Sequence, residues 1–349
     1  MPRQVFVFLG ACVVMIATMV LVPRSAVGQA PAGAAGTGTQ PLTSWGDPDL
    51  QGVWDFRTIT PMERPGELAD KAVLTEEEAA AFAEAQSRRL NRDLIDSAQG
   101  GLNYAPEADG GVVPYNEFWY DRGTSVVSSR RTSLIIDPPD GRFPPLTPEG
   151  QRRAGVLREI RREEQRGRPL ADKPADRGMG DRCIMGFNAG PPMVPSAYNN
   201  NFQLFQTSDY VVILNEMVHN ARIVPLDGRP HVAIRQWSGD SRGRWEGNTL
   251  VIDTTNFSGE TSLNGSGPTM HLVERFTRVD ADTVNYEVTV ENPDTWTRPW
   301  TMEVQLMQQD DQVPQMFEYA CHEGNYSLAT VLRGARLEEQ AAEEAARQR

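Results

Sequence analysis

The sequence lacks the short patterns that would assign it a common enzymatic activity. It contains no G-x-S-x-G elbow for a nucleophilic serine, no Walker phosphate-binding loop and no glycine-rich dinucleotide fingerprint. Its four histidines form neither an H-x-H nor an H-E-x-x-H pair, so no local metal motif is present, and a distributed site of His219, His271 and His322 with Glu216 is left open. These absences disfavour serine hydrolases, nucleotide-dependent enzymes and zincin-type metalloenzymes, and no cofactor can be named.

Positive charge and aromatic residues are also scarce. The 34 Lys and Arg residues face 47 Asp and Glu residues, which gives a formal net charge of −13, and no basic stripe is interleaved with aromatics. Such a chain repels phosphate backbones, so nucleic-acid binding is disfavoured. The aromatic fraction is 8%, whereas 30 Gly and 25 Pro indicate many turns, and this balance favours a turn-rich β protein.

Long hydrophobic runs are missing except for one at the N-terminus. Arg3 precedes the apolar run Val5–Val22, and the small-residue pattern Gly28-Gln29-Ala30 follows it. This predicts a secretory signal peptide (residues 1–30) that is cleaved after Ala30, with an uncleaved membrane anchor as the alternative. We expect residues 31–44 to form a flexible linker. The resulting protein would be periplasmic or secreted, without a membrane span, and its oligomeric state is not predicted.

Cysteine is scarce, with three copies in the chain. Cys12 lies in the predicted signal peptide, which leaves Cys183 and Cys321 in the mature protein. Two thiols in an oxidising compartment favour a disulfide bond, and a pair of buried free cysteines is the alternative. Such a bond would fasten the long aperiodic loop 184–201 to the end of the last strand.

The second half of the sequence is dominated by β-sheet periodicity. No helix-length segment interrupts the short strands that follow Asn201, and turn signals such as Asp227-Gly228 and Glu246-Gly247-Asn248 separate them. Because parallel strands need long crossover connections, the pattern predicts an antiparallel meander. Strands are expected at 49–56, 125–137, 202–206, 210–225, 231–237, 244–255, 271–279, 283–290, 300–307 and 316–319.

A meander of this length closes into a barrel or folds into a sandwich. We predict a mainly β fold that closes into a lipocalin- or calycin-like barrel, with a β-sandwich as the alternative. The pattern indicates a single β-rich domain over residues 45–335, with helical insertions near 75–94 and 147–166. A further helix is expected from Tyr326 onward, and residues 336–349 form its charged tail.

Two local motifs carry resemblances to known proteins. Gly52-Val53-Trp54 resembles the G-x-W motif of calycin and lipocalin-like barrels, where the tryptophan closes one end. The hairpin sequence Gly243–Val251 (GRWEGNTLV) is similar to that of a widespread group of exported bacterial proteins. The likeness also includes Arg182-Cys183, Asn215–Arg222, Asp227–His231 and Glu318–Cys321. It implies export and an autonomous fold, and it supplies no catalytic residue.

The run 210–225 contains the first candidate site residues. Alternation along a strand would place Glu216, Asn220 and Arg222 on one face and His219 on the other. A carboxylate and a guanidinium on an otherwise apolar face either pair with each other or line a cavity, and the sequence leaves both readings open. In the cavity reading, Glu216, Arg222 and His271 would hold the polar end of a ligand.

Further candidates come from the remaining strands. Glu274 shares the apolar face of the strand that begins at His271, and His322 follows Cys321 where the loop 184–201 is expected to arrive. Histidines and carboxylates are the usual general acids and bases. The predicted catalytic residues are His219, His271, His322 and Glu216, and the predicted ligand-binding residues are Arg222, Glu274, Trp245 and Glu318.

Two classes of function fit these features. The first is an exported protein that binds a small, largely apolar molecule in a polar-lined β-barrel cavity. The second is a cofactor-independent lyase, isomerase or hydrolase that uses a His/Glu general acid–base pair. The sequence does not decide whether the protein is an enzyme.

Overall fold

The fold is taken from a computed structural model, which describes residues 41–100, 106–107, 115–165, 170–309 and 316–348. All of these residues belong to one compact unit, residues 36–349. The predicted signal peptide lies outside the described residues, and so does most of the predicted linker. In the part of the chain that is described, no helix is long and apolar enough to cross a membrane.

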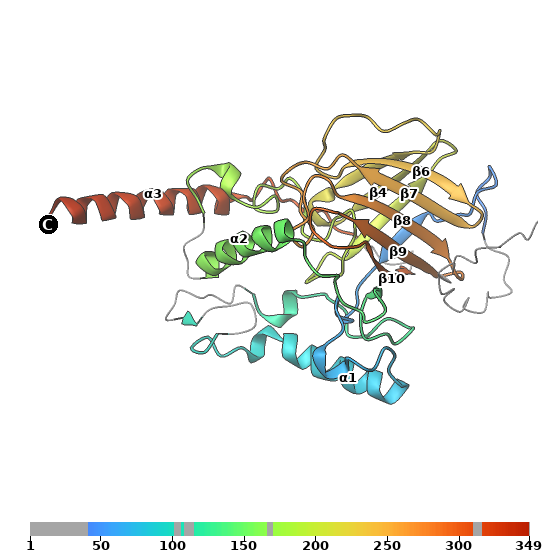
Figure 1. The fold of residues 1–349 in the computed structure, drawn as a ribbon, viewed down its shortest axis with the longest axis horizontal. Coiled ribbons are helices and arrows are strands. Elements are labelled where there is room, and N and C mark those ends of the chain that lie inside the picture. Colours follow the sequence, from blue (N-terminus) through green and yellow to red (C-terminus); the bar gives the residue numbers. More distant parts are fainter. Residues whose placement is uncertain (1–40, 101–105, 108–114, 166–169, 310–315, 349) are drawn as a thin grey trace, which may run out of the picture. The chain divides into compact units, whose positions relative to one another are not determined.

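The centre of the fold is one antiparallel sheet (Figure 1). Nine strands follow the order β5-β4-β3-β1-β10-β9-β8-β7-β6, and the short β2 pairs with β10. Leu226 and Val224, at the end of β5, lie against Gly243 of β6, so the two ends of this order approach each other. No backbone ladder joins them among the described strands, and the sheet is therefore a nearly closed barrel. The strands are β1 (Gly52–Asp55), β2 (Ile135–Asp137), β3 (Asn201–Gln206), β4 (Tyr210–Asn215), β5 (Ala221–Pro225), β6 (Asp240–Glu246), β7 (Thr249–Thr255), β8 (His271–Arg278), β9 (Thr283–Glu291) and β10 (Trp300–Gln308).

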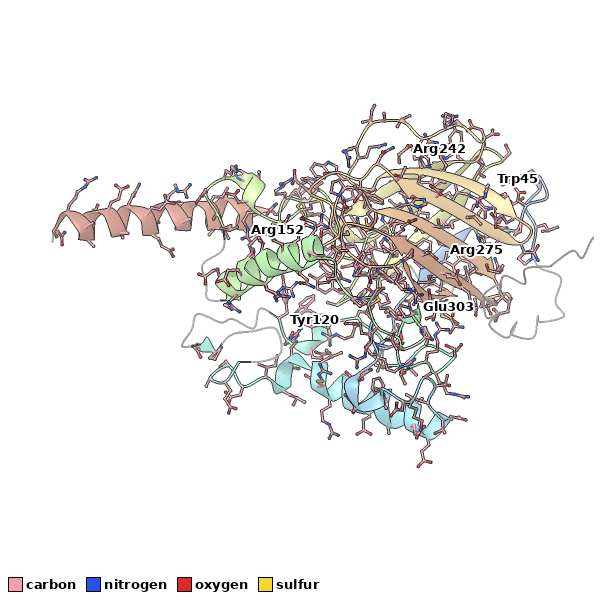
Figure 2. The ribbon with its side chains drawn as sticks, viewed as in Figure 1. Trp45, Tyr120, Arg152, Arg242, Arg275 and Glu303 are labelled. Atoms are coloured by element: carbon pink, nitrogen blue, oxygen red, sulfur yellow. A yellow bond between two sulfur atoms is a disulfide. The ribbon has the colours of Figure 1, made fainter. Side chains whose placement is uncertain are left out.

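Strand alternation fills the inside of the barrel with side chains. Along β8, every second residue is buried, as the period of two requires. Arg275 on β8 and Glu303 on β10 alternate with buried neighbours and mark the outward face (Figure 2). The inward residues form one hydrophobic core that includes Trp54, Phe202, Ile252, Phe276, Val288 and Trp300. The prediction of a mainly β antiparallel barrel is confirmed.

Three α-helices accompany the sheet. They are α1 (Glu76–Leu90), α2 (Pro148–Gln165) and α3 (Tyr326–Arg347). The N-terminus of α1 is held by a capping box, in which the Thr75 hydroxyl accepts from the Glu78 N–H and the Glu78 carboxylate accepts from the Thr75 N–H. All three helices occur where the sequence predicts them, and α1 ends four residues earlier than expected. The short 3₁₀ turns are η1 (Gly66–Leu68), η2 (Arg92–Leu94), η4 (Glu117–Trp119), η5 (Pro174–Asp176) and η6 (Met217–His219).

Several predicted strands differ from those observed. The run 210–225 is a hairpin rather than one strand, because η6 turns the chain between β4 and β5. Residues 231–237 and 316–319 form no strand, and the run 125–137 contributes only β2. All ladders between named strands are antiparallel, as predicted, and an isolated parallel bridge joins Gln236 to Phe257.

Candidate functional site

The interior of the barrel holds a buried polar network. Arg222 of β5 donates two hydrogen bonds to the Glu274 carboxylate of β8, one of them at 2.9 Å, and the Tyr286 hydroxyl of β9 donates to the same carboxylate at 2.6 Å. All three side chains are buried. Burial acts to lower the pKa of Arg222, but the Glu274 charge outweighs it and the pKa is raised. These groups satisfy one another, which favours the interpretation in which the charged side chains pair with each other over the one in which they hold a ligand.

The structure does not bring Glu216, Arg222 and His271 into one internal cavity, and this expectation is wrong. The partner of Arg222 is Glu274 rather than Glu216. His271 is half-buried and its Nε2 lies 3.0 Å from Asp253 Oδ2. The other oxygen of Asp253 lies 3.0 Å from Nε2 of His231, whose Nδ1 is 2.9 Å from Asp240. The two histidines therefore belong to a separate network, in which His231 from the connection between β5 and β6 joins Asp240 of β6, Asp253 of β7 and His271 of β8.

Glu216 occupies the turn between β4 and β5. The hairpin has no glycine there, and Val218 and His219 take positive φ values of 59° and 42°. A β-branched residue in this region is strained, and such strain gathers at functional sites. The turn buries Glu216 to 4% exposure, where its Oε2 accepts from Asn201 Nδ2 at 2.8 Å and its Oε1 accepts from the Phe317 N–H at 3.0 Å.

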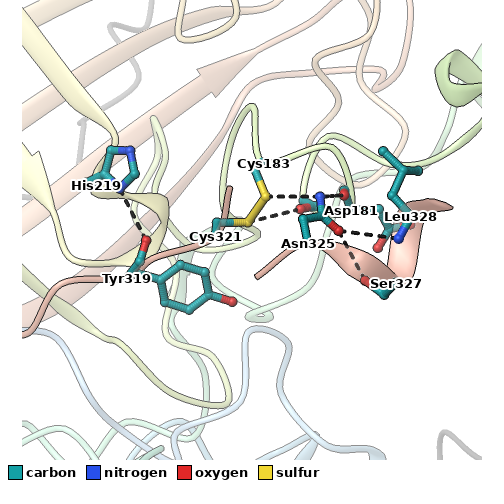
Figure 3. The surroundings of a disulfide bond; sticks show 9 residues. Asp181, Cys183, His219, Tyr319, Cys321, Asn325, Ser327 and Leu328 are labelled. Atoms are coloured by element: carbon teal, nitrogen blue, oxygen red, sulfur yellow. Dashed lines mark hydrogen bonds between the residues drawn. A yellow bond between two sulfur atoms is a disulfide. The ribbon is translucent and has the colours of Figure 1, made fainter. Parts of the chain in front are cut away.

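A disulfide bond holds residues 316–325, which we call the pinned segment, against this turn (Figure 3). The Cys183–Cys321 bond has a Cα–Cα distance of 5.7 Å, which confirms the predicted pairing. The Tyr319 carbonyl oxygen lies 3.3 Å from Nδ1 of His219, and the Asn325 side chain donates to the Asp181 carbonyl at 2.8 Å. The segment is therefore fastened at several points next to Glu216.

The loop that follows Cys183 packs against the same turn. A Cβ atom at Gly186 would lie 1.9 Å from Met217 Cγ, so only glycine allows this approach. Met217, Val218, Cys183 and Ala189 form a small buried cluster, on which Tyr198 and Tyr319 pack. The expected meeting of the loop 184–201 and the segment around Cys321 is therefore present.

These elements enclose a pocket of about 580 Å³, which we call the aromatic pocket. It lies where β1 and β10 end and β3 begins, as the register of Asp55 with Met307 and Asn201 shows. Its polar lining residues are Arg57, Asp121, Asn199, Asn201, Glu216 and Gln309. Its aromatic lining residues are Tyr115, Trp119, Tyr198, Phe317 and Tyr319.

The charges around the aromatic pocket are unevenly balanced. Arg57 donates to Asp55 and to Asp121, each at 2.5 Å, so two carboxylates share one guanidinium. Burial raises the pKa of Asp55, and the nearby Asp121 charge adds to this rise, although the bond to Arg57 opposes it.

Burial also raises the pKa of Tyr198 to about 12, and the neighbouring Tyr319 adds to the effect. The Tyr198 phenol is therefore neutral and able to donate a hydrogen bond at pH 7.

Of the candidate site residues predicted from the sequence, Glu216 is the only one among the described lining residues of the aromatic pocket. His322 and the exposed Glu318 belong to the pinned segment, and the ring centroid of His219 lies 6.3 Å from that of His322. Trp245 packs against the hydrophobic core, and its indole N–H has no hydrogen-bond partner among the residues that the structure describes. Among the described residues, no three His, Cys, Asp or Glu side chains gather in a way that could hold a metal ion.

The aromatic lining is the part of the site that the sequence analysis misses. A signal for it exists, because residues 115–120 (YNEFWY) contain four aromatic residues in a chain that is 8% aromatic. Tyr115, Phe118 and Trp119 are also unusually exposed for large hydrophobic side chains. Exposed aromatics that cluster mark binding surfaces more often than isolated ones do.

Comparisons with known proteins identify no family for this chain. No protein-family model matches the sequence, and no curated protein matches it. A solved structure, a crystal structure of a mutant of the fluorescent protein UnaG, is similar to this chain with a TM-score of 0.22 and 12% sequence identity. The match covers 38% of this chain and 88% of that one.

Proposed function

We propose that the protein binds a small, largely apolar molecule in the aromatic pocket at the end of the barrel. The observation that carries the proposal is the buried Glu216 carboxylate beneath aromatic walls. Each of its oxygens accepts one hydrogen bond from the protein, whereas a carboxylate offers about four acceptor sites. A fixed polar group that retains acceptor capacity next to aromatic lining residues is a usual means of orienting a ligand.

The size and the construction of the pocket support this proposal. A volume of about 580 Å³ lies within the range of about 300–1,000 Å³ that small-molecule sites occupy. The disulfide and the contacts of Glu216 with Asn201 and Phe317 hold two of its walls in place. A rigid site loses less conformational entropy on binding, so affinity is gained without extra contacts.

The alternative of a His/Glu acid–base enzyme has less support. In the described structure the Glu216 carboxylate contacts Asn201 and Phe317, and His219 contacts the Tyr319 carbonyl oxygen. A general acid–base pair needs its members within hydrogen-bond reach of a common substrate atom. No described contact joins the Glu216 carboxylate to His219 or His322, so binding is the function that we propose.

Titration with N-phenyl-1-naphthylamine, a neutral aromatic molecule that fluoresces in apolar surroundings, tests the proposal. We expect saturable binding to the wild-type protein, and at least about fivefold weaker binding to Trp119→Ala, because one wall of the pocket is removed. Trp45→Ala is the matched control, since Trp45 is 40% exposed and does not line the pocket (Figure 2). Absence of saturable binding to the wild-type protein, or an equal loss of affinity in Trp119→Ala and Trp45→Ala, would refute the proposal.

We also propose that this binding takes place outside the cytoplasm. The disulfide supports this, because such bonds persist in oxidising compartments. The predicted cleavage after Ala30 would give a mature protein that begins at Pro31. N-terminal sequencing of the exported protein tests this proposal, and recovery of an intact Met1 would refute it.

A further inference from the structure

We infer that the ligand of the aromatic pocket carries a positively charged ammonium group, so the pocket is a site for an organic cation. This inference rests on the proposed function and deepens it by naming the ligand class. Two independent features of the pocket lead to it, its charge balance and its aromatic walls.

The charge balance favours a cation. Among the described lining residues, Asp121 and Glu216 are acidic and Arg57 is the single basic residue. Arg57 is already held by Asp55 and Asp121, each at 2.5 Å, so its charge is compensated before any ligand enters. Glu216 is 4% exposed and its two described partners are the neutral Asn201 amide and the Phe317 backbone N–H. A buried carboxylate without a cationic partner is costly, and a bound ammonium group would relieve this cost.

The aromatic walls favour the same ligand. Five aromatic residues line one pocket, namely Tyr115, Trp119, Tyr198, Phe317 and Tyr319. Aromatic faces attract cations through the ring quadrupole, and several such rings around one space form the cages that recognise quaternary ammonium groups. Because the pKa of Tyr198 is raised to about 12, its hydroxyl adds no negative charge at neutral pH. The attraction therefore comes from the ring faces and from the Glu216 carboxylate.

The same features disfavour an anionic ligand. An anion would need an uncompensated guanidinium or ammonium group, and Arg57 is bonded to two carboxylates. It would also approach the buried Glu216 carboxylate at close range, where like charges repel. A neutral apolar ligand fits the walls and leaves Glu216 without an ionic partner.

Three matched compounds separate these ligand classes. Benzyltrimethylammonium, neopentylbenzene and phenylmethanesulfonate share a benzyl group with a compact tetrahedral head, and they are respectively cationic, neutral and anionic. Each would be used to displace bound N-phenyl-1-naphthylamine from the wild-type protein. We expect the cation to act at a concentration at least about tenfold lower than either of the other two.

Variants locate the source of the preference. Glu216→Gln keeps the shape of the side chain and is expected to weaken displacement by benzyltrimethylammonium at least about fivefold, while N-phenyl-1-naphthylamine still binds. Glu323→Gln, an exposed carboxylate on the pinned segment, is the matched control and should leave the preference unchanged. If Glu216→Gln fails to fold in a thermal unfolding control, Asp121→Asn replaces it, and a smaller but measurable loss of the cation preference is expected.

The outcomes distinguish the two proposals. If N-phenyl-1-naphthylamine binds in a Trp119-dependent way but the anion or the neutral compound displaces it as well as the cation does, the inference fails and the proposed function stands. If the cation preference survives both carboxylate substitutions, the inference also fails. If the fluorescent compound does not bind at all, the proposed function itself fails.

Discussion

At the scale of single residues, the buried Arg222–Glu274–Tyr286 network carries the sharpest prediction on stability. Removing the carboxylate in Glu274→Ala leaves the Arg222 guanidinium buried without a partner. We expect the free energy of unfolding to fall by about 3–5 kcal/mol. Urea unfolding followed by tryptophan fluorescence measures it.

Two further variants make this prediction specific. Asp137→Ala removes the exposed Arg298–Asp137 pair and should cost no more than about 1 kcal/mol. The double variant Arg222→Met with Glu274→Leu replaces the ion pair by apolar side chains and should be less destabilised than Glu274→Ala, because no charge remains buried. A double variant that is more destabilised than the single one would contradict this account.

The His271–Asp253 pair predicts a pH dependence of stability. The hydrogen bond to Asp253 raises the pKa of His271 above its ordinary value of 6.5, and the same bond lowers the pKa of Asp253 below 3.8. The contribution of His271 is therefore complete below pH 6.5 and is lost as the pH rises through its raised pKa. The contribution of Asp253 is complete above pH 3.8 and is lost as the pH falls through its lowered pKa, so both are present between these values.

The measurement compares urea unfolding of the wild-type protein and His271→Gln at about pH 5.5 and about pH 9. We expect the difference in unfolding free energy to be larger at the lower pH, because His271 is charged there and bonded to Asp253. The same comparison in an Asp253→Asn background is the control, and it should show a smaller change with pH. An equal difference at both pH values in the first comparison would count against the ion pair.

Residue-scale chemistry could be predicted only in part. Alternation along the strand correctly predicts that Glu274 shares an apolar face with its neighbours, because that inference needs only the period of two. The partner of Glu274 could not be predicted, because Arg222 lies on β5 and reaches β8 across the barrel interior. Contacts of that kind depend on how the sheet closes, which local sequence does not encode.

At the scale of elements, the two hairpins show what turn signals can and cannot predict. Gly247-Asn248 joins β6 to β7, and the sequence marks this turn because glycine readily adopts the positive φ of 61° found there. The turn between β4 and β5 uses Val218 and His219 at positive φ, a region that a β-branched residue such as valine strongly disfavours. The local sequence therefore continues the strand pattern, and the turn is stabilised by tertiary contacts, including those of Met217 with the loop after Cys183.

The disulfide is the element whose removal should affect both stability and binding. Its cysteines are 138 residues apart, and removing a cross-link over a loop of this length is expected to cost about 2–5 kcal/mol. In the variant Cys183→Ser with Cys321→Ser, Phe317 and Tyr319 also lose the restraint that keeps them against the aromatic pocket. We expect lower stability in urea and weaker binding of N-phenyl-1-naphthylamine.

A reducing agent provides the control for the disulfide prediction. Dithiothreitol should lower the stability of the wild-type protein toward that of the double serine variant, and it should leave the variant itself unchanged. If the variant bound the fluorescent compound as tightly as the wild-type protein, the pinned segment would not be part of the site.

At the scale of the whole molecule, the barrel is held together by contacts between segments that are far apart in sequence. Strand β1 lies between β3 and β10, so residues near position 54 pair with residues near positions 202 and 308. The sequence predicts the antiparallel meander from local turns, but it does not predict where the opening strand inserts. This insertion matters for the site, since it brings Arg57 beside Asn201 and Gln309 in the aromatic pocket.

The remaining gap in the sheet lies between β5 and β6, where side-chain packing replaces a backbone ladder. A Cβ atom at Gly243 would lie 2.5 Å from Leu226 Cδ2 and 2.9 Å from Val224 Cγ1, so glycine is what permits the close approach of the two strands. Gly243→Val should force them apart and reduce the free energy of unfolding by about 1–3 kcal/mol. In hydrogen exchange, the amides of β5 and β6 should lose protection more than those of β8 and β9.

Gly259→Ala is the control, because no described atom lies within 4 Å of the added Cβ. A Gly243→Val protein as stable as the control, with unchanged exchange, would show that packing along this seam does not close the barrel.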